Sequence, residues 1–118
     1  MPEHIKLNKK LGIIEVDSHD KVSYEEGVAS LASLQTLMAE TGIRKVLVDT
    51  RRQKFNPDLF KVYDFGKRLP NSAQIAVMVS QKQPTREAIS LLNDVAHNRG
   101  VNVRVFGSRS EALEWLHA

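Results

Sequence analysis

The chain has 118 residues, of which 42% are hydrophobic and 26% are charged, so we expect a single globular domain spanning residues 1–118. It has no cysteine, which excludes disulfides, thiolate metal sites and a cysteine nucleophile. No apolar run reaches the roughly 18 residues of a membrane helix, and no signal-peptide pattern opens the chain, so we expect a cytoplasmic protein without an integral membrane segment. The net charge of +3 permits an anionic partner but does not indicate nucleic acid.

The N-terminal part predicts a β-hairpin followed by a helix. His4 to Leu7 alternates between polar and apolar residues, and Leu11 to Val16 is apolar apart from Glu15. A polar loop is expected over residues 17–21. A helix then runs from Ser23 to about Thr41, because a capping box opens it, Gly42 ends it, and apolar residues recur on one face at Val28, Leu31, Leu34 and Met38.

The middle of the chain predicts a buried strand, a basic loop and a second helix. Lys45 to Asp49 is a continuous apolar run typical of a strand covered on both faces, so it belongs at the centre of a parallel sheet. Residues 50–54 are polar and predict a loop. Asn56, Pro57 and Asp58 supply the start of a helix that runs to about Arg68.

The remaining segments continue the alternation of strands and helices. Residues 75–79 predict a buried strand and residues 84–99 a helix with one apolar face, ended by Gly100. Residues 101–105 alternate and predict an edge strand, and a capping box at Ser108 and Glu111 opens a short last helix. The fold class is therefore α/β, a mixed, mostly parallel sheet with an N-terminal hairpin and four helices in the order β-β-α-β-α-β-α-β-α.

The predicted loops after the parallel strands contain basic residues. In open α/β folds these loops lie at the edge of the sheet where ligands usually bind. Arginine side chains and helix N-termini together suit phosphate or carboxylate, although exposed basic loops also serve solubility alone. An apolar alternative is a cavity lined by aromatic residues, although core packing is the more common explanation for such residues. The aromatic residues are Phe55, Phe60, Tyr63, Phe65 and Trp115. The predicted surface for a ligand or partner comprises Asp49, Thr50, Arg51, Arg52, Phe55, Asn56, Asp58, Phe60, Tyr63, Ser80 and Arg109.

Motifs for catalysis, cofactors and metals do not stand out. No Gly-rich phosphate loop is present, and the four histidines show no arrangement of nucleophile and base. Asp17, His19 and Asp20 fall in one turn without a second ligand cluster, so we expect neither a metal nor a cofactor. Asp49 could correspond to the phosphate-accepting aspartate of a response-regulator receiver domain. The lysine that such a domain carries after its fifth strand is missing from residues 106–108, so this interpretation is not favoured.

The VLVD strand of residues 46–49, the Asn-Pro-Asp helix start and the closing VFGSRSEALEWL together resemble the STAS (sulfate transporter and anti-sigma factor antagonist) superfamily. More narrowly, the chain is similar to its SpoIIAA-like, or STAS/SEC14, group of small bacterial proteins. The resemblance implies a non-enzymatic regulatory module that works through protein contacts or binds an apolar, lipid-like ligand. Phospho-switched members carry a serine at the second helix start, but residues 55–59 contain no hydroxyl, so Thr50 and Ser80 are the remaining candidate phosphorylation sites.

These observations favour an interaction module that binds a protein partner or a second copy of the chain. An apolar or anionic small ligand at the edge after the central strand remains an open alternative. A further alternative is a small enzyme acting on an anionic substrate at the same edge. Self-assembly through the apolar second helix is another class, and nucleic acid is not expected as a partner.

Overall fold

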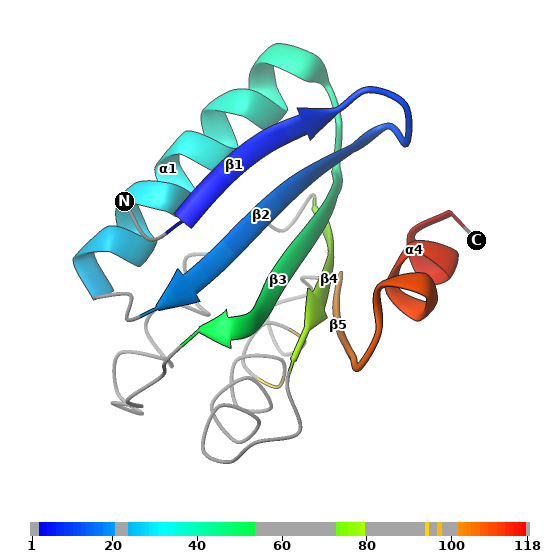
Figure 1. The fold of residues 1–118 in the computed structure, drawn as a ribbon. Coiled ribbons are helices and arrows are strands. Elements are labelled where there is room, and N and C mark those ends of the chain that lie inside the picture. Colours follow the sequence, from blue (N-terminus) through cyan, green and yellow to red (C-terminus); the bar gives the residue numbers. More distant parts are fainter. Residues whose placement is uncertain are drawn as a thin grey trace.

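The computed structural model describes residues 3–20, 24–53, 73–79 and 102–117, together with Asp94 and His97. They form strands β1 (Glu3–Asn8) and β2 (Ile13–Asp20), helix α1 (Tyr24–Thr41), strands β3 (Lys45–Gln53), β4 (Gln74–Met78) and β5 (Asn102–Phe106), and helix α4 (Arg109–His117) (Figure 1). The helix predicted for residues 57–68 lies outside the described residues, as does Ser23 of the first capping box. Of the helix predicted for residues 84–99, the structure describes Asp94 and His97, which are both helical.

The predicted N-terminal hairpin is confirmed, and Asn8 holds its turn. The Asn8 carbonyl accepts a hydrogen bond from the Gly12 N–H at 2.9 Å, and its side-chain oxygen accepts one from the Leu11 N–H at 3.1 Å. Gly12 has a φ of 68°, a left-handed conformation that a side chain disfavours. This turn fixes an antiparallel register in which Lys6 lies opposite Glu15.

Helix α1 ends where the sequence predicts. Gly42 has a φ of 75°, and its N–H donates to the Met38 carbonyl at 2.8 Å, which is the left-handed arrangement that ends many helices. The next residues lead directly into β3, so the connection from β2 through α1 to β3 is a compact crossover between parallel strands.

Within the described residues, five strands form one sheet in the order β1-β2-β3-β4-β5. The β1–β2 pair is antiparallel, whereas the β2–β3, β3–β4 and β4–β5 pairs are parallel. This confirms the mixed, mostly parallel sheet, with β3 at its centre and β5 at an edge. The exposed fractions along β5 alternate in its first residues, as expected for an edge strand with one face toward water.

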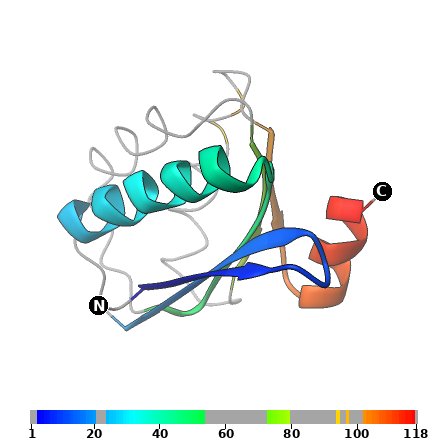
Figure 2. The ribbon, with the colours of Figure 1, turned by 90° about the horizontal axis from the view of Figure 1, so that it is seen from above.

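The two described helices lie on opposite faces of the sheet (Figure 2). Leu31, Leu34 and Met38 of α1 pack on one face against a cluster that includes Ile14 and Val46. On the other face, α4 contributes Ala112 and Leu116 to a second cluster, whose sheet members are Ile13, Leu47, Ala76 and Met78. Successive residues such as Ile13 and Ile14 therefore face different helices, as the period of a strand requires.

Two predicted loops are instead strands. Residues 17–20 continue β2, and residues 50–53 continue β3 to Gln53, so the polar loops predicted at both places are wrong. The two polar ends pair with each other, with His19 opposite Arg52 and Asp20 opposite Gln53. Backbone pairing supplies the strand here without an apolar pattern, and a register shift between Asp17 and His19 accommodates it.

Candidate functional site

On the α4 side of the sheet, polar side chains cover the first three strands. The register places His4, Asp17 and Asp49 at neighbouring positions across β1, β2 and β3. Lys6 and Glu15 occupy the neighbouring row of the same face. Since adjacent strands lie about 4.8 Å apart, side chains in one row are within reach of one another.

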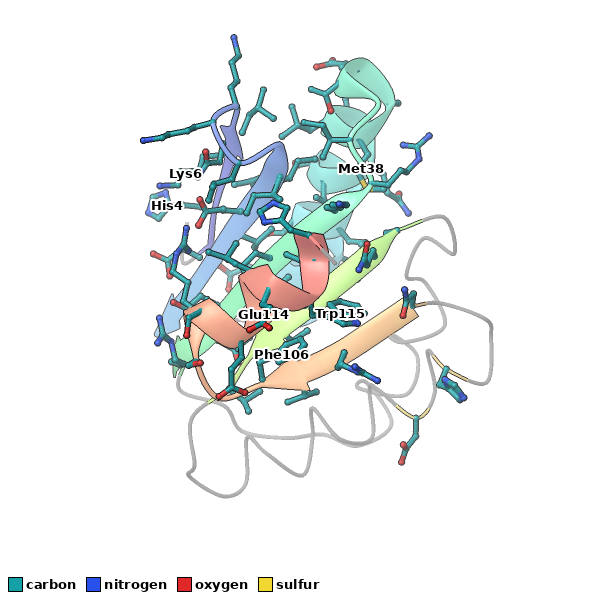
Figure 3. The ribbon with its side chains drawn as sticks, turned by 90° about the vertical axis from the view of Figure 1, so that its right-hand side faces the viewer. His4, Lys6, Met38, Phe106, Glu114 and Trp115 are labelled. Carbon is teal, nitrogen blue, oxygen red and sulfur yellow. The ribbon has the colours of Figure 1, made fainter. Side chains whose placement is uncertain are left out.

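A cavity of ≈ 320 Å³ lies over this part of the sheet, at the first residue of α4. Its apolar floor includes the buried side chains of Leu47 and Met78, each 1% exposed. Figure 3 shows His4 and Lys6 at the β1 edge, and Phe106, Glu114 and Trp115 near α4 and β5. The lining residues come from four strands and one helix: His4, Lys6, Glu15, Val16, Asp17, Leu47, Asp49, Met78 and Arg109.

Glu15 joins the hairpin to α4 at the cavity wall. Its Oε1 lies 2.6 Å from Nη1 of Arg109, and its Oε2 accepts a hydrogen bond from Nδ2 of Asn8 at 2.7 Å. The hydrogen bond from Arg109 has the largest effect on the pKa of Glu15 and lowers it. Burial raises this pKa, whereas the hydrogen bond from Asn8 and the charge of Lys6 lower it further. Glu15 is therefore held ionised.

Asp49 and Arg51 form a second ion pair nearby. Arg51 donates from Nε to Oδ1 at 3.0 Å and from Nη2 to Oδ2 at 2.9 Å, and its backbone N–H also donates to Oδ1 at 3.0 Å. This bidentate hydrogen bond is the main reason that the pKa of Arg51 is raised, and the charge of Asp17 adds to it. The Asp49 side chain is 23% exposed.

The two ion pairs belong to one electrostatic cluster. The pKa of Arg109 is raised chiefly by its hydrogen bond to Glu15 and also by the charge of Asp49, whereas the charge of Arg51 lowers it. Sequence reasoning placed Asp49, Arg51 and Arg109 on one surface, and the structure brings Asp49 and Arg109 into one cavity. Whether these residues bind a ligand or partner stays a prediction.

Thr50 lies in strand β3 and is buried, whereas the sequence predicted an exposed loop at this position. It is 5% exposed, and its hydroxyl donates to the Met78 carbonyl at 2.7 Å in the buried interior. Because consecutive side chains of a strand point to opposite faces of the sheet, Thr50 lies on the other face from Asp49. A hydroxyl held in this way is not presented to a kinase.

The side chains of the other predicted site residues lie outside the described part of the structure. For Arg52 the structure describes the backbone in β3 only. Six predicted site residues lie outside the described residues: Phe55, Asn56, Asp58, Phe60, Tyr63 and Ser80. Of the predicted aromatic set, Trp115 is described; its ring lies 5.6 Å from that of Phe106 and 5.8 Å from the Arg104 guanidinium, on the α4 side of β5.

Sequence reasoning missed Glu15, Lys6 and Asn8. Glu15 was noted only as an interruption of an apolar run. That interruption is the signal: a carboxylate inside a strand with apolar neighbours needs a cationic or hydrogen-bonding partner when the strand is covered. The partner, Arg109, could not be identified from the sequence because the two residues are 94 positions apart.

The described residues include no helix long and apolar enough to cross a membrane. Within the same part of the chain, no three His, Asp or Glu side chains are grouped so that they would hold a metal ion.

Solved structures resemble this chain over nearly its whole length. An anti-sigma factor antagonist from Mycobacterium paratuberculosis superimposes with a TM-score of 0.68 at 13% identity, covering 98% of this chain and 93% of that one. An uncharacterised protein of the DUF3478 family with a SpoIIAA-like fold, from Shewanella loihica PV-4, gives a TM-score of 0.64 at 16% identity, covering 97% and 91%. The chain has a SpoIIAA-like fold.

These structures confirm the SpoIIAA-like resemblance inferred from the sequence, whereas the four helices of the predicted fold are not confirmed. No family model matches the sequence. No curated protein matches it at a significant level. The likeness therefore lies in the backbone, and the cavity beside α4 has to be interpreted from its own residues.

Proposed function

We propose that this SpoIIAA-like chain is a non-enzymatic regulatory module that acts by binding a partner protein. The observation that carries the proposal is the likeness of its backbone to an anti-sigma factor antagonist over 98% of the chain. Fold alone does not determine function, so the chemistry of the site has to agree with the proposal.

The chemistry of Glu15 supports binding over catalysis. A general acid or base works best when its pKa lies near the pH at which the protein operates. The hydrogen bond from Arg109 moves the pKa of Glu15 away from neutrality, below its ordinary value of 4.5. A carboxylate held ionised by an arginine is suited to fixing the shape and charge of a surface, and this is what a binding module needs.

The cavity also offers a place for a small ligand. Its volume of ≈ 320 Å³ is at the small end of the range for ligand pockets, about 300–1,000 Å³. Leu47 and Met78 give it an apolar floor, and Lys6 and Arg109 give it cationic walls, so an apolar or an anionic ligand is compatible with it. Native mass spectrometry of the purified protein, compared with the denatured spectrum, tests this directly, because a retained ligand adds mass in the native spectrum alone.

Site-specific photo-crosslinking tests the partner-binding function. A photoreactive amino acid is placed at Arg51, an exposed residue beside the cavity, and in a second protein at Gln35, an exposed residue of α1 on the other side of the sheet. The proposal predicts a crosslinked protein that depends on the position of the photoreactive group. The captured protein, once purified, should bind the unmodified chain in isothermal titration calorimetry.

The enzyme alternative makes a different prediction. A small enzyme acting on an anionic substrate would show turnover that Arg109→Gln abolishes while the protein stays folded. That result, together with crosslinks that form equally from Arg51 and Gln35, would contradict the proposed function. Turnover unaffected by Arg109→Gln would point to a contaminant and leave the binding module in place.

A further inference from the structure

The exposed side chains between residues 4 and 10 are three lysines and a histidine. Between residues 4 and 10 the exposed residues are His4, Lys6, Lys9 and Lys10, whereas Ile5, Leu7 and Asn8 are half-buried. We name the four exposed residues the basic strip. Because β1 is an edge strand of the described sheet, this strip runs along a border of the molecule that a partner can approach.

The basic strip continues into the cavity. His4 and Lys6 belong to the strip and also line the cavity, where Arg109 adds a further cation from α4. Lys6 lies opposite Glu15 in the hairpin, and both Lys6 and Arg109 act on the charge of Glu15, so the two cations flank the same carboxylate. Figure 3 shows the Lys6 side chain at the β1 edge.

Hydrogen-bond donors with capacity for a partner remain at this place. Glu15 already accepts from Asn8 and Arg109, and Asp49 accepts three hydrogen bonds from Arg51. Arg109 uses one guanidinium nitrogen for Glu15, and its side chain is 41% exposed, so other N–H groups remain for a partner. Lys6 makes no hydrogen bond or ion pair with the rest of the described chain and presents an exposed ammonium.

We infer that the basic strip and the adjoining cavity form a docking surface for an acidic segment of a partner protein, with one carboxylate of the segment bound by Lys6 and by the remaining guanidinium N–H groups of Arg109. The inference rests on the proposed partner-binding function and names the chemistry of the partner. A carboxylate at that point receives charge-assisted hydrogen bonds from two cations and leaves the Glu15–Arg109 and Asp49–Arg51 ion pairs intact. The methylene groups of a glutamate side chain fit the apolar floor of Leu47 and Met78.

The carboxylates around the cavity favour a protein segment over a nucleic acid or an anionic membrane. Glu15, Asp17 and Asp49 line the same cavity as Lys6 and Arg109. A continuous row of phosphates would bring further negative charge against these carboxylates, which is unfavourable. A peptide places acidic residues at intervals and fills the spaces with neutral ones, so it matches the alternation of charge on this surface.

Fluorescence anisotropy with the full chain tests the inference. The probe is a fluorescein-labelled peptide of alternating glutamate and glycine, with its glutamine counterpart as the uncharged control. Lys6→Gln removes a charge from the strip, and Arg104→Gln removes one from β5 at the opposite edge of the sheet. We expect binding of the acidic peptide that weakens as salt rises, about a three- to fivefold loss of affinity in Lys6→Gln, and no loss in Arg104→Gln. Amide shifts on titration should concentrate in residues 3–10 and near Arg109.

Other results overturn the inference in different ways. Equal loss of affinity in Lys6→Gln and Arg104→Gln would show a response to net charge alone. Tighter binding of single-stranded DNA or anionic vesicles than of the acidic peptide would assign the strip to a polyanion. No difference between the glutamate and glutamine peptides would leave the lysines with the sole role of preventing pairing of edge strands. A partner crosslinked only from α1 would contradict the docking surface and retain the proposed function. Peptide binding without any crosslinked partner would retain an acidic-peptide site at this surface and contradict the proposed function.

Discussion

Arg109 and Glu15 are 94 positions apart in the sequence, and the Nη1 and Oε1 atoms of their ion pair are 2.6 Å apart. The pair joins the first residue of α4 to the middle of β2. A second contact joins the other end of α4 to the same hairpin, where Nε2 of His117 lies 3.0 Å from the Leu11 carbonyl oxygen. The C-terminal helix is thus attached to the N-terminal hairpin at both of its ends, and the cavity opens beside the first of these attachments.

The Glu15–Arg109 pair predicts a pH-dependent contribution to stability. The pKa of Glu15 is lower in the folded protein than its ordinary value of 4.5. A group of this kind stabilises the fold fully above its unfolded pKa, and the contribution is lost as the pH falls through the folded pKa. We expect Glu15→Gln to lower the free energy of unfolding by about 0.5–1 kcal/mol near neutral pH, since the Arg109 side chain is 41% exposed and screened.

Chemical denaturation of the wild type and Glu15→Gln over a pH series measures this contribution. The difference in the free energy of unfolding between the two proteins should be constant well above pH 4.5, the ordinary pKa of the carboxyl group, and should shrink at lower pH. Arg109→Gln and the variant with both substitutions complete a double-mutant cycle. Arg109→Gln should lower the free energy of unfolding less in the Glu15→Gln protein than in the wild type. A difference that grows as the pH falls would contradict the assignment of the lowered pKa to this pair.

The alternation and turn residues of the sequence were sufficient to predict the hairpin, α1, the buried run of β3 and the start of α4. Each of these has a local cause: Gly42 ends α1, and Ser108 accepts a weak hydrogen bond from the Glu111 N–H at 3.4 Å at the start of α4. Local causes lie within a few residues and are visible in the sequence.

The ends of β2 and β3 were not predictable for a physical reason. Their residues are polar, and the strands exist there because each end pairs with the other, as with Asp20 and Gln53. The burial of Thr50 likewise depends on the Met78 carbonyl, 28 positions away. The site was predictable to the extent that parallel strands bring Asp49 and Arg109 to one edge; Glu15 and Lys6 joined it through an antiparallel hairpin that local patterns do not relate to α4.

Leu116 should be essential for the packing of α4. It is fully buried, and its cluster includes Ile13, Leu47 and Met78 of the sheet. We expect Leu116→Ala to destabilise the protein by about 2–4 kcal/mol, since it removes apolar contacts and leaves a void. Urea denaturation followed by the fluorescence of Trp115, on the same helix, reports the loss.

Glu114→Ala provides the matched control on α4. Glu114 is exposed, so its replacement should change the free energy of unfolding by no more than about 0.5 kcal/mol. If the Leu116 and Glu114 variants lost the same stability, the packing of α4 on the sheet would not be the source of the effect.

Gly42 should tolerate a side chain sterically but not conformationally. Its φ is 75°, and apart from its two neighbours in the chain no residue has an atom within 4 Å of the position that a Cβ would take. The cost of Gly42→Ala is therefore a backbone cost, and we expect about 1 kcal/mol, measured by thermal or chemical denaturation. Gly42→Asn should cost less, because asparagine enters the left-handed region more readily. Equal costs for alanine and asparagine would argue for a steric cause instead.

Thr50 distinguishes a strand interior from the loop that the sequence predicted. It is 5% exposed and donates to the Met78 carbonyl at 2.7 Å, so Thr50→Val removes a buried hydrogen bond while keeping the shape, and we expect a loss of about 1 kcal/mol. Thr50→Asp, a common mimic of phosphothreonine, places a charge in the same interior and should cost more than about 3 kcal/mol. Chemical denaturation of both variants measures the order. In an exposed loop each substitution would change stability by less than about 0.5 kcal/mol, so two neutral variants would contradict the position of Thr50 in β3 and restore it as a candidate phosphorylation site.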